Sequence, residues 1–127
     1  MEDISQGLLT AELEHINDKT AVLRLSGEID LSSVHVLGEQ FEGIVGQHLP
    51  DVIVDATSVT FMDSTGLHAL VEGKRALHES GTRIYLVPSS QVRRVLELVF
   101  PDPLFAARVA SVDEALAAIG SGDSEEV

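Results

Sequence analysis

The sequence predicts a single α/β domain with a largely parallel sheet, and three observations support this prediction. Short runs rich in Val, Ile and Leu alternate along the chain with longer segments in which apolar residues recur every three or four positions. That alternation is typical of strands connected by helices. The chain has 127 residues, the length of one domain with its own core. Because 44% of the residues are apolar and only 4% aromatic, the core must be mainly aliphatic.

The first elements are predicted to form a β-hairpin. Apolar and polar residues alternate over residues 9 to 15, as in a half-buried strand. The turn signal Asn17-Asp18-Lys19 follows, and a second strand is predicted over residues 21 to 25. We expect the segment from Ser26 to Asp30, which contains a glycine and two acidic residues, to break this second strand.

A helix and a central strand are predicted next. Asp30, Ser32 or Ser33 is expected to cap the helix, and Pro50 to end it. The apolar stripe of this helix comprises Val34, Leu37, Phe41, Ile44, Val45 and Leu49. Residues 51 to 55 form a short run with a continuous apolar centre, which is typical of a strand covered on both faces. Residues 56 to 62 are predicted to be a connecting loop.

The pattern of helix and strand continues in the second half of the chain. A helix is predicted from near Ser64 to the stop signal Ser80-Gly81, and a strand over residues 82 to 87. A third helix is expected after Pro88-Ser89-Ser90. The apolar residues of these two helices are Leu67, Leu70, Val71 and Leu77 in the first, and Val92, Val95, Leu96 and Val99 in the second.

The C-terminal part is predicted to contain a short edge strand and a last helix. Pro101-Asp102-Pro103 is a rigid break, and residues 106 to 110 are the candidate edge strand. The segment from Ser111 to Glu114 resembles a capping box and begins the last helix, which carries Val112, Ala115, Leu116 and Ile119. The predicted order is therefore β-β-α-β-α-β-α-(β)-α, with a mixed sheet of four or five strands and about four helices.

Charge and composition exclude several classes of function. The formal net charge is −13, so we expect neither a nucleic acid partner, which needs Lys and Arg contacts, nor an anionic membrane partner. Either a partner with a basic face is attracted instead, or the acidity serves only to keep the protein soluble. The N-terminal residues do not form a signal peptide, and no run approaches the ~18 apolar residues of a spanning helix. Cysteine is absent, and we expect a soluble, cytoplasmic protein.

The segment around Ser64 is the candidate functional site. Asp63-Ser64-Thr65-Gly66 lies between a buried strand and the start of a helix. Helix starts carry unpaired N–H groups and a partial positive charge, which makes them suitable for a phosphate. Gly66 has no side chain and would let another group approach the backbone. The same residue types are also ordinary helix caps, and local chemistry alone favours that structural role.

Three segments together resemble the STAS family, the bacterial antagonists of anti-sigma factors. They are Asp63-Ser64-Thr65-Gly66-Leu67 after Phe61-Met62, Leu25-Ser26-Gly27-Glu28-Ile29-Asp30, and the C-terminal pattern of Val92, Leu96-Glu97-Leu98, Leu104-Phe105 and Ser111 to Leu116. The resemblance covers residues 5 to 119, and it departs at His68 and at residues 99 to 103. It implies a STAS-like domain over residues 1–119, followed by an acidic tail, 120–127, that we expect to be disordered.

The resemblance implies a phosphorylation switch at Ser64. In this family, an anti-sigma factor that is also a serine kinase phosphorylates the serine after the aspartate, and a serine phosphatase resets it. The unphosphorylated protein binds the anti-sigma factor and frees the sigma factor. By position, the switch loop and partner surface comprise Asp30, Asp63, Thr65, Gly66, Leu67 and His68. The resemblance further implies a partner-switching regulator of transcription in the stress response, which is not an enzyme, has no cofactor, and is a monomer or weak dimer.

Other functions remain open at this stage. His68 lies one helical turn after Ser64, and Asp30 or Asp63 would supply the acid of a Ser-His-Asp arrangement, although the Gly-x-Ser-x-Gly elbow is absent. Five scattered histidines lack metal-ligand spacing: His15, His35, His48, His68 and His78.

The main alternative is a STAS-type regulatory module, without a sigma-factor role, that binds a nucleotide or another small ligand at residues 64 to 66. The usual phosphate-binding motifs are absent.

Overall fold

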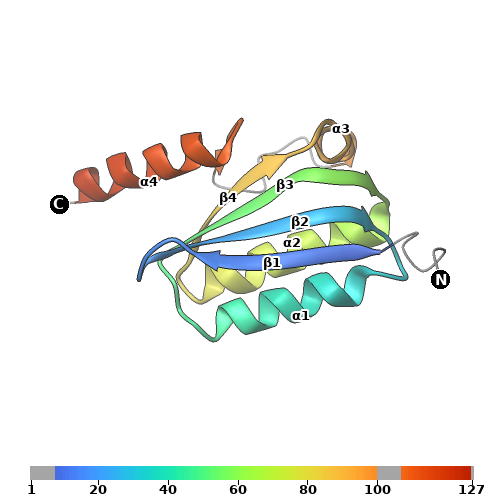
Figure 1. Cartoon of the computed structure of the whole chain (residues 1–127), viewed down its shortest axis with the longest axis horizontal. Coiled ribbons are helices and arrows are strands. Elements are labelled where there is room, and N and C mark those ends of the chain that lie inside the picture. The colour runs from blue at the N-terminus through green and yellow to red at the C-terminus, as the bar shows by residue number, and fades with distance from the viewer. Residues whose placement is uncertain (1–7, 100–106, 127) are drawn as a thin grey trace.

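The computed structural model describes residues 8–99 and 107–126, and in this part of the chain it contains a five-stranded sheet in the order β1-β2-β3-β4-β5 (Figure 1). Strand β1 is antiparallel to β2, and the other neighbouring strands are parallel. The predicted α/β class and element order are confirmed. The strands are β1 Leu9–His15, β2 Thr20–Ile29, β3 Asp51–Met62, β4 Arg83–Pro88 and β5 Ala107–Arg108; the helices are α1 Val34–Val45, α2 Ser64–Glu79, α3 Ser90–Val99 and α4 Val112–Glu126.

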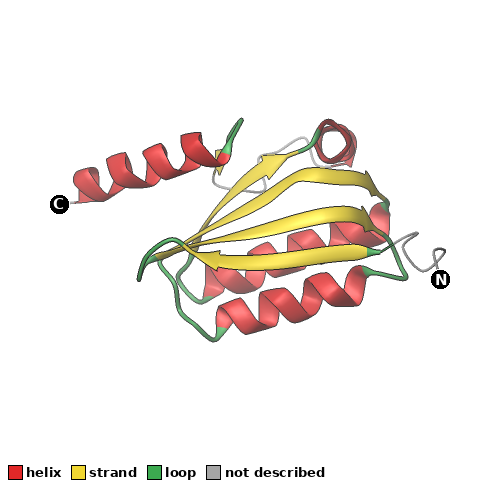
Figure 2. Ribbon diagram, viewed as in Figure 1, coloured by secondary structure: helices red, strands yellow, loops and turns green. Residues whose placement is uncertain are grey.

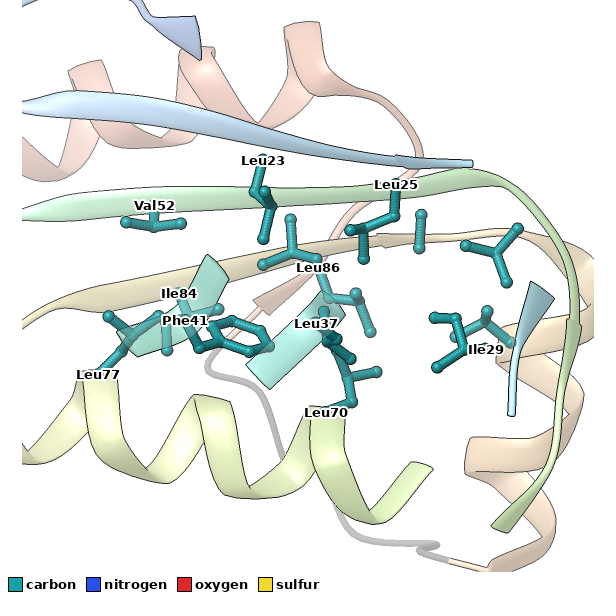
Figure 3. Close-up of a cluster of buried hydrophobic side chains, with 14 of the residues drawn as sticks. Leu23, Leu25, Ile29, Leu37, Phe41, Val52, Leu70, Leu77, Ile84 and Leu86 are labelled. Atoms are coloured by element: carbon teal, nitrogen blue, oxygen red, sulfur yellow. The ribbon is translucent and has the colours of Figure 1, made fainter. Parts of the chain in front are cut away.

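The sheet is covered by helices on both faces. Helices α1 and α2 lie together on one face, and α4 lies on the opposite face (Figure 2). The larger core cluster joins alternate residues of β2, β3 and β4 to α1, α2 and α3 (Figure 3). Its labelled members in the figure are Leu23, Leu25, Ile29, Leu37, Phe41, Val52, Leu70, Leu77, Ile84 and Leu86.

A second core cluster lies under α4. Val22, Ile53 and Tyr85 pack there against Ala115 and Ile119 of α4. The neighbouring residues of the same strands face the larger cluster, because side chains alternate between the two faces of a sheet. The continuous apolar run of β3 therefore is buried on both sides, as the sequence predicts for a central strand.

Strands β2 and β3 are longer than the sequence predicts. We expected a break at residues 26–30 and a loop at 56–62, but the two strands remain paired as far as Ile29 and Met62. The register shifts near Gly27, whose φ of 112° lies in the left-handed region and whose missing Cβ would collide with the backbone oxygen of Leu8. Because both strands end together, the segments after them, which begin at Asp30 and Asp63, start at the same edge of the sheet.

Helix α1 is shorter than predicted. It ends at Val45 rather than at Pro50, with the N–H of Gly46 donating to carbonyl groups of the last turn. His48 then adopts a φ of 54°, which a helix cannot continue. Leu49 is buried outside the helix, and its carbonyl accepts a hydrogen bond of 2.6 Å from the hydroxyl of Thr82. Leu49 therefore does not belong to the apolar stripe of α1, contrary to the prediction, but reaches the core from the loop after this helix.

Helix α4 begins at the predicted cap and extends beyond its predicted end. The Ser111 hydroxyl accepts a hydrogen bond of 3.0 Å from the N–H of Glu114, and the Glu114 carboxylate accepts one from Ala110. The helix continues to Glu126, where we expected a disordered tail; once nucleated, a helix is extended at little cost per residue. The domain boundary at residue 119 stays a prediction. The predicted break at residues 101–103 lies outside the described residues.

None of the helices in the described ranges is long and apolar enough to cross a membrane.

Candidate functional site

Helix α2 is capped by Asp63, the residue before Ser64. The backbone of Asp63 is extended, with φ −103° and ψ −172°, and its carboxylate accepts a hydrogen bond of 3.0 Å from the N–H of Gly66. The carbonyl of Asp63 accepts the first helical hydrogen bond, from the N–H of Leu67 at 3.0 Å. A side-chain cap of this kind contributes about 1 kcal/mol to stability. Asp63 therefore performs the helix-capping role that local chemistry predicts for this segment.

Ser64 is the first residue of α2, and its side chain is exposed. Within the described residues, the Ser64 hydroxyl has no hydrogen-bond partner, and neither do the backbone N–H groups of Ser64 and Thr65. These groups carry the partial positive charge of the helix start. A negative charge added to Ser64 would thus lie beside unpaired donors, where the helix stabilises it.

Gly66 and Leu67 lie behind Ser64, on the inner side of the helix. A Cβ on Gly66 would come within 2.6 Å of the Ile29 carbonyl oxygen and 2.9 Å of Met62 Cγ. The close approach predicted for Gly66 is therefore made by the end of β2, inside the domain. Leu67 is only 2% exposed and packs in the larger core cluster, so its side chain is not available to a partner.

His68 has the opposite placement. Its side chain is 76% exposed, and its Nε2 lies 4.0 Å from Oε2 of Glu72, one turn further along α2. Thr65 is partly exposed. Among the predicted site residues that follow Ser64 in α2, Thr65 and His68 thus remain accessible, whereas Gly66 and Leu67 are buried.

Asp30 lies on the neighbouring segment and is held at the same edge of the sheet. The N–H of Asp63 donates a hydrogen bond of 3.3 Å to the Ile29 carbonyl, and Ile29 pairs with Met62 in the sheet. Asp30 and Ser64 therefore follow adjacent strand ends.

Two serines that the sequence analysis did not assign to the site hold the Asp30 carboxylate. Its Oδ1 accepts hydrogen bonds from the hydroxyl of Ser32 at 2.8 Å and from the N–H of Ser33 at 3.2 Å. The Ser32 hydroxyl is the largest cause of a lowered pKa of Asp30, and partial desolvation opposes it. Ser32 and Ser33 were predicted only as candidate helix caps, yet an aspartate followed by serines is itself a turn signal.

Two exposed apolar side chains at this edge were also missed by the sequence analysis. Leu31, directly after Asp30, is 75% exposed, and Phe61, near the end of β3, is 42% exposed. Exposed large apolar side chains are frequent in contact surfaces. The signal that could have identified Leu31 is an isolated leucine in an otherwise polar loop.

The Ser-His-Asp alternative is not supported by the geometry. The candidate acids are engaged elsewhere, Asp30 by Ser32 and Asp63 by Gly66, while His68 is next to Glu72. Within the described ranges, no hydrogen bond joins Ser64 to a base, and no group of three His, Asp or Glu side chains is arranged to hold a metal ion.

Comparison with known proteins gives one consistent family. A model of the STAS domain matches residues 11–115. The anti-sigma F factor antagonist of Lysinibacillus sphaericus is 30% identical over 88 residues, which cover 68% of this chain and 75% of that protein. The structure of an anti-sigma factor antagonist from Mycobacterium paratuberculosis is 28% identical, with a TM-score of 0.73, and covers 87% of this chain and 92% of its own.

The antagonist SpoIIAA is similar as well, and it has been solved in two states. Its unphosphorylated form has a TM-score of 0.69 at 26% identity, covering 88% of this chain and 97% of that one; its phosphorylated form, from Bacillus, has a TM-score of 0.67. These relatives are named as antagonists of anti-sigma factors, in agreement with the predicted regulatory, non-enzymatic class. The chain belongs to the STAS domain family.

Proposed function

We propose that this chain is an anti-sigma factor antagonist that is switched by phosphorylation of Ser64. The unphosphorylated form binds an anti-sigma factor that is also a serine kinase, and this binding releases a sigma factor in the cytoplasm. Phosphorylation of Ser64 ends the binding, and a serine phosphatase restores it. The observation that carries the proposal is that Asp63 caps α2, which leaves the Ser64 hydroxyl exposed and free of hydrogen bonds among the described residues.

The chemistry of a phosphate at this position explains how binding would end without refolding. A phosphoserine carries a charge of about −1.5 to −2 at neutral pH. Within the monomer, the unpaired N–H groups of Ser64 and Thr65 accommodate that charge. In a complex, the same phosphate would have to lose water, which is costly, and would lie near the carboxylates of Asp63 and Asp30. The switch is thus local electrostatics at an interface.

The proposed contact surface surrounds Ser64. It combines the exposed His68 and the partly exposed Thr65 with the apolar side chains of Leu31 and Phe61. A few apolar side chains inside a polar rim usually supply most of the affinity of such an interface. The net charge of −13 would accelerate association with a basic partner surface. The chain itself is proposed to be a monomer or weak dimer.

The experiment is a binding series with a purified anti-sigma kinase and no ATP. Ser64→Ala should bind as tightly as the unmodified chain, and Ser64→Asp at least about tenfold more weakly, a loss of about 1.4 kcal/mol. The matched control is Ser90→Asp, because Ser90 is likewise an exposed first residue of a helix, α3. Ser90→Asp should bind normally. Equal affinities of Ser64→Asp and Ser90→Asp would reject the switch.

The ligand-binding alternative is tested on the same proteins. If residues 64 to 66 hold the phosphate of a nucleotide, the free N–H groups of Ser64 and Thr65 would bind it, and calorimetry with ATP or GTP would give a heat of binding that Ser64→Asp abolishes. The antagonist proposal predicts no such difference between the unmodified chain and Ser64→Asp.

A further inference from the structure

A groove of about 400 Å³ runs between helices α1 and α2, away from the Ser64 end of α2. Its walls and floor are formed mainly by small and apolar residues: Gly38, Phe41 and Val45 from α1, and Ala69, Gly73 and Ala76 from α2. The groove is open to solvent, since Gly38 and Ala76 are exposed. It therefore presents apolar surface to the outside of the helical layer.

The groove exists because the side chains along it are short. Gly73 lies against the ring of Phe41, and a Cβ at this position would collide with the ring. Phe41 is 4% exposed and forms the floor. The small residues at 38, 69 and 76 leave the space above this floor unfilled, so the side chain of another molecule can enter it.

The rim of the groove is acidic. Glu42 stands on α1 and Glu72 on α2, and both side chains are exposed. In the described part of the chain, Oε2 of Glu72 lies 4.0 Å from Nε2 of His68. The lining contains no Lys or Arg. An apolar floor between two carboxylates matches an apolar side chain flanked by cations.

We propose that this groove is a docking site for a basic amphipathic helix of a partner protein. The apolar residues of that helix enter the groove between α1 and α2, and its Lys or Arg residues pair with Glu42 and Glu72. Apolar side chains spaced three or four residues apart are the usual anchors of a helix bound in such a groove. The site goes beyond the Ser64 switch, because its lining contains none of the residues proposed for the surface around Ser64. The two surfaces adjoin where His68 lies next to Glu72.

Charge complementarity distinguishes the two candidate occupants of the groove, a foreign basic helix and a second copy of this chain. A foreign basic helix is attracted both by the rim carboxylates and by the net charge of −13. A second copy of the chain would offer Arg93 and Arg94, which are exposed on α3, but it would bring the same net negative charge. Repulsion between two such copies opposes this contact, so the foreign helix is the better match.

The test uses two synthetic helical peptides and the isotope-labelled full chain. The first peptide has an apolar stripe of Leu and Ala bordered by Lys; the second is identical except that Glu replaces Lys. In nuclear magnetic resonance titrations, the Lys peptide should shift the backbone signals of Gly38, Ala69 and Gly73. The Glu peptide should leave them unchanged. Shifts spread evenly over the acidic surface, without preference for the groove, would overturn the proposal.

Two pairs of variants separate the groove from the rest of the surface. Gly38→Leu fills the groove, whereas Gly43→Leu places the same side chain outside it on the same helix; a Cβ at either position meets nothing within 4 Å. Gly38→Leu should weaken the Lys peptide at least about tenfold, and Gly43→Leu by less than about twofold. Glu72→Lys should weaken it more than Glu79→Lys, which changes the same charge outside the lining.

Self-association is measured alongside. If the chain without peptide sediments as larger species at high concentration, and Gly38→Leu but not Gly43→Leu abolishes them, then a second copy occupies the groove and the proposal is wrong. Equal peptide affinities of Gly38→Leu and Gly43→Leu would also reject it. A monomeric chain whose peptide binding is lost in Gly38→Leu alone is the expected result.

Discussion

The Asp63 carboxylate accepts a hydrogen bond of 3.0 Å from the backbone N–H of Gly66 and so caps helix α2. This cap stands one residue before Ser64. The Ser64 hydroxyl is consequently exposed, without a hydrogen-bond partner in the described part of the chain. Two adjacent residues therefore have separate roles, one in stability and one in the proposed switch, and substitutions can separate them.

Replacing the cap should cost stability, whereas replacing the neighbouring serine should not. Asp63→Ala removes the acceptor for the Gly66 N–H and should lower the free energy of unfolding by about 1 kcal/mol. Ser64→Ala should change it by less than about 0.5 kcal/mol, as for an ordinary surface substitution. Urea denaturation of both variants measures this. A larger loss for Ser64→Ala than for Asp63→Ala would mean that the serine is the cap.

Gly66 should not tolerate even a methyl group. A Cβ there lies 2.6 Å from the carbonyl oxygen of Ile29, a backbone atom that cannot move away cheaply, so Gly66→Ala should be destabilised by about 1–3 kcal/mol. Gly43→Ala is the matched control, because a Cβ at Gly43 in α1 meets nothing within 4 Å. Since alanine favours helix over glycine, Gly43→Ala should gain up to about 1 kcal/mol. Equal melting temperatures of Gly66→Ala and Gly43→Ala would contradict the close packing of Gly66 against Ile29.

Asp30 should contribute to stability in a way that depends on pH. Hydrogen bonds, first of all from the Ser32 hydroxyl, hold the pKa of Asp30 below its ordinary value of 3.8. A carboxyl whose pKa is lowered by folding stabilises the fold above the ordinary value, and this contribution is lost as the pH falls through the folded pKa. The difference in the free energy of unfolding between the unmodified chain and Asp30→Asn should therefore be largest near neutral pH and decrease below about pH 3.8.

The cause of the Asp30 shift can be tested separately. Ser32→Ala removes the hydrogen bond that contributes most to the lowered pKa of Asp30. It should therefore raise this pKa toward its ordinary value in a carboxyl titration followed by nuclear magnetic resonance. An unchanged pKa in Ser32→Ala would show that the Ser32 hydroxyl does not hold the charge.

Phosphorylation of Ser64 should leave the fold intact. The N–H groups at the start of α2 are available for the added charge, and Ser64 itself packs against nothing in the core. Changes in the backbone signals of the phosphorylated chain should be confined to residues near 30 and to residues 63–68. Widespread changes across the sheet would indicate refolding in place of a local switch.

Most of the fold could be predicted because the apolar patterns of its elements are local. The extensions of β2 and β3 could not be predicted. Residues 26–29 include Ser26, Gly27 and Glu28, and residues 56–62 mix polar and apolar residues without regular alternation, so both segments become strands by pairing with each other. That pairing joins segments about 30 residues apart, as in Ser26 with Ser58. The strand propensity of either segment alone does not predict such a pairing.

The position of the site was predictable, but the roles of its residues were only partly so. The helix start at Ser64 follows from the pattern, whereas the placement of Asp30 near Ser64 was implied by the resemblance to the STAS family. Three features depend on where β2 ends relative to α2: the cap by Asp63, the packing of Gly66 on Ile29 and the burial of Leu67. This is a tertiary relationship, and the Asp-Ser-Thr-Gly string is compatible with several such arrangements.

The most direct test of the switch is the mass of the chain after incubation with ATP and its anti-sigma kinase. The account predicts a gain of one phosphate, about 80 Da, mapped by peptide fragmentation to Ser64, absent from Ser64→Ala and unchanged in the control Ser90→Ala. A phosphate located on another residue, or full phosphorylation of Ser64→Ala, would contradict it.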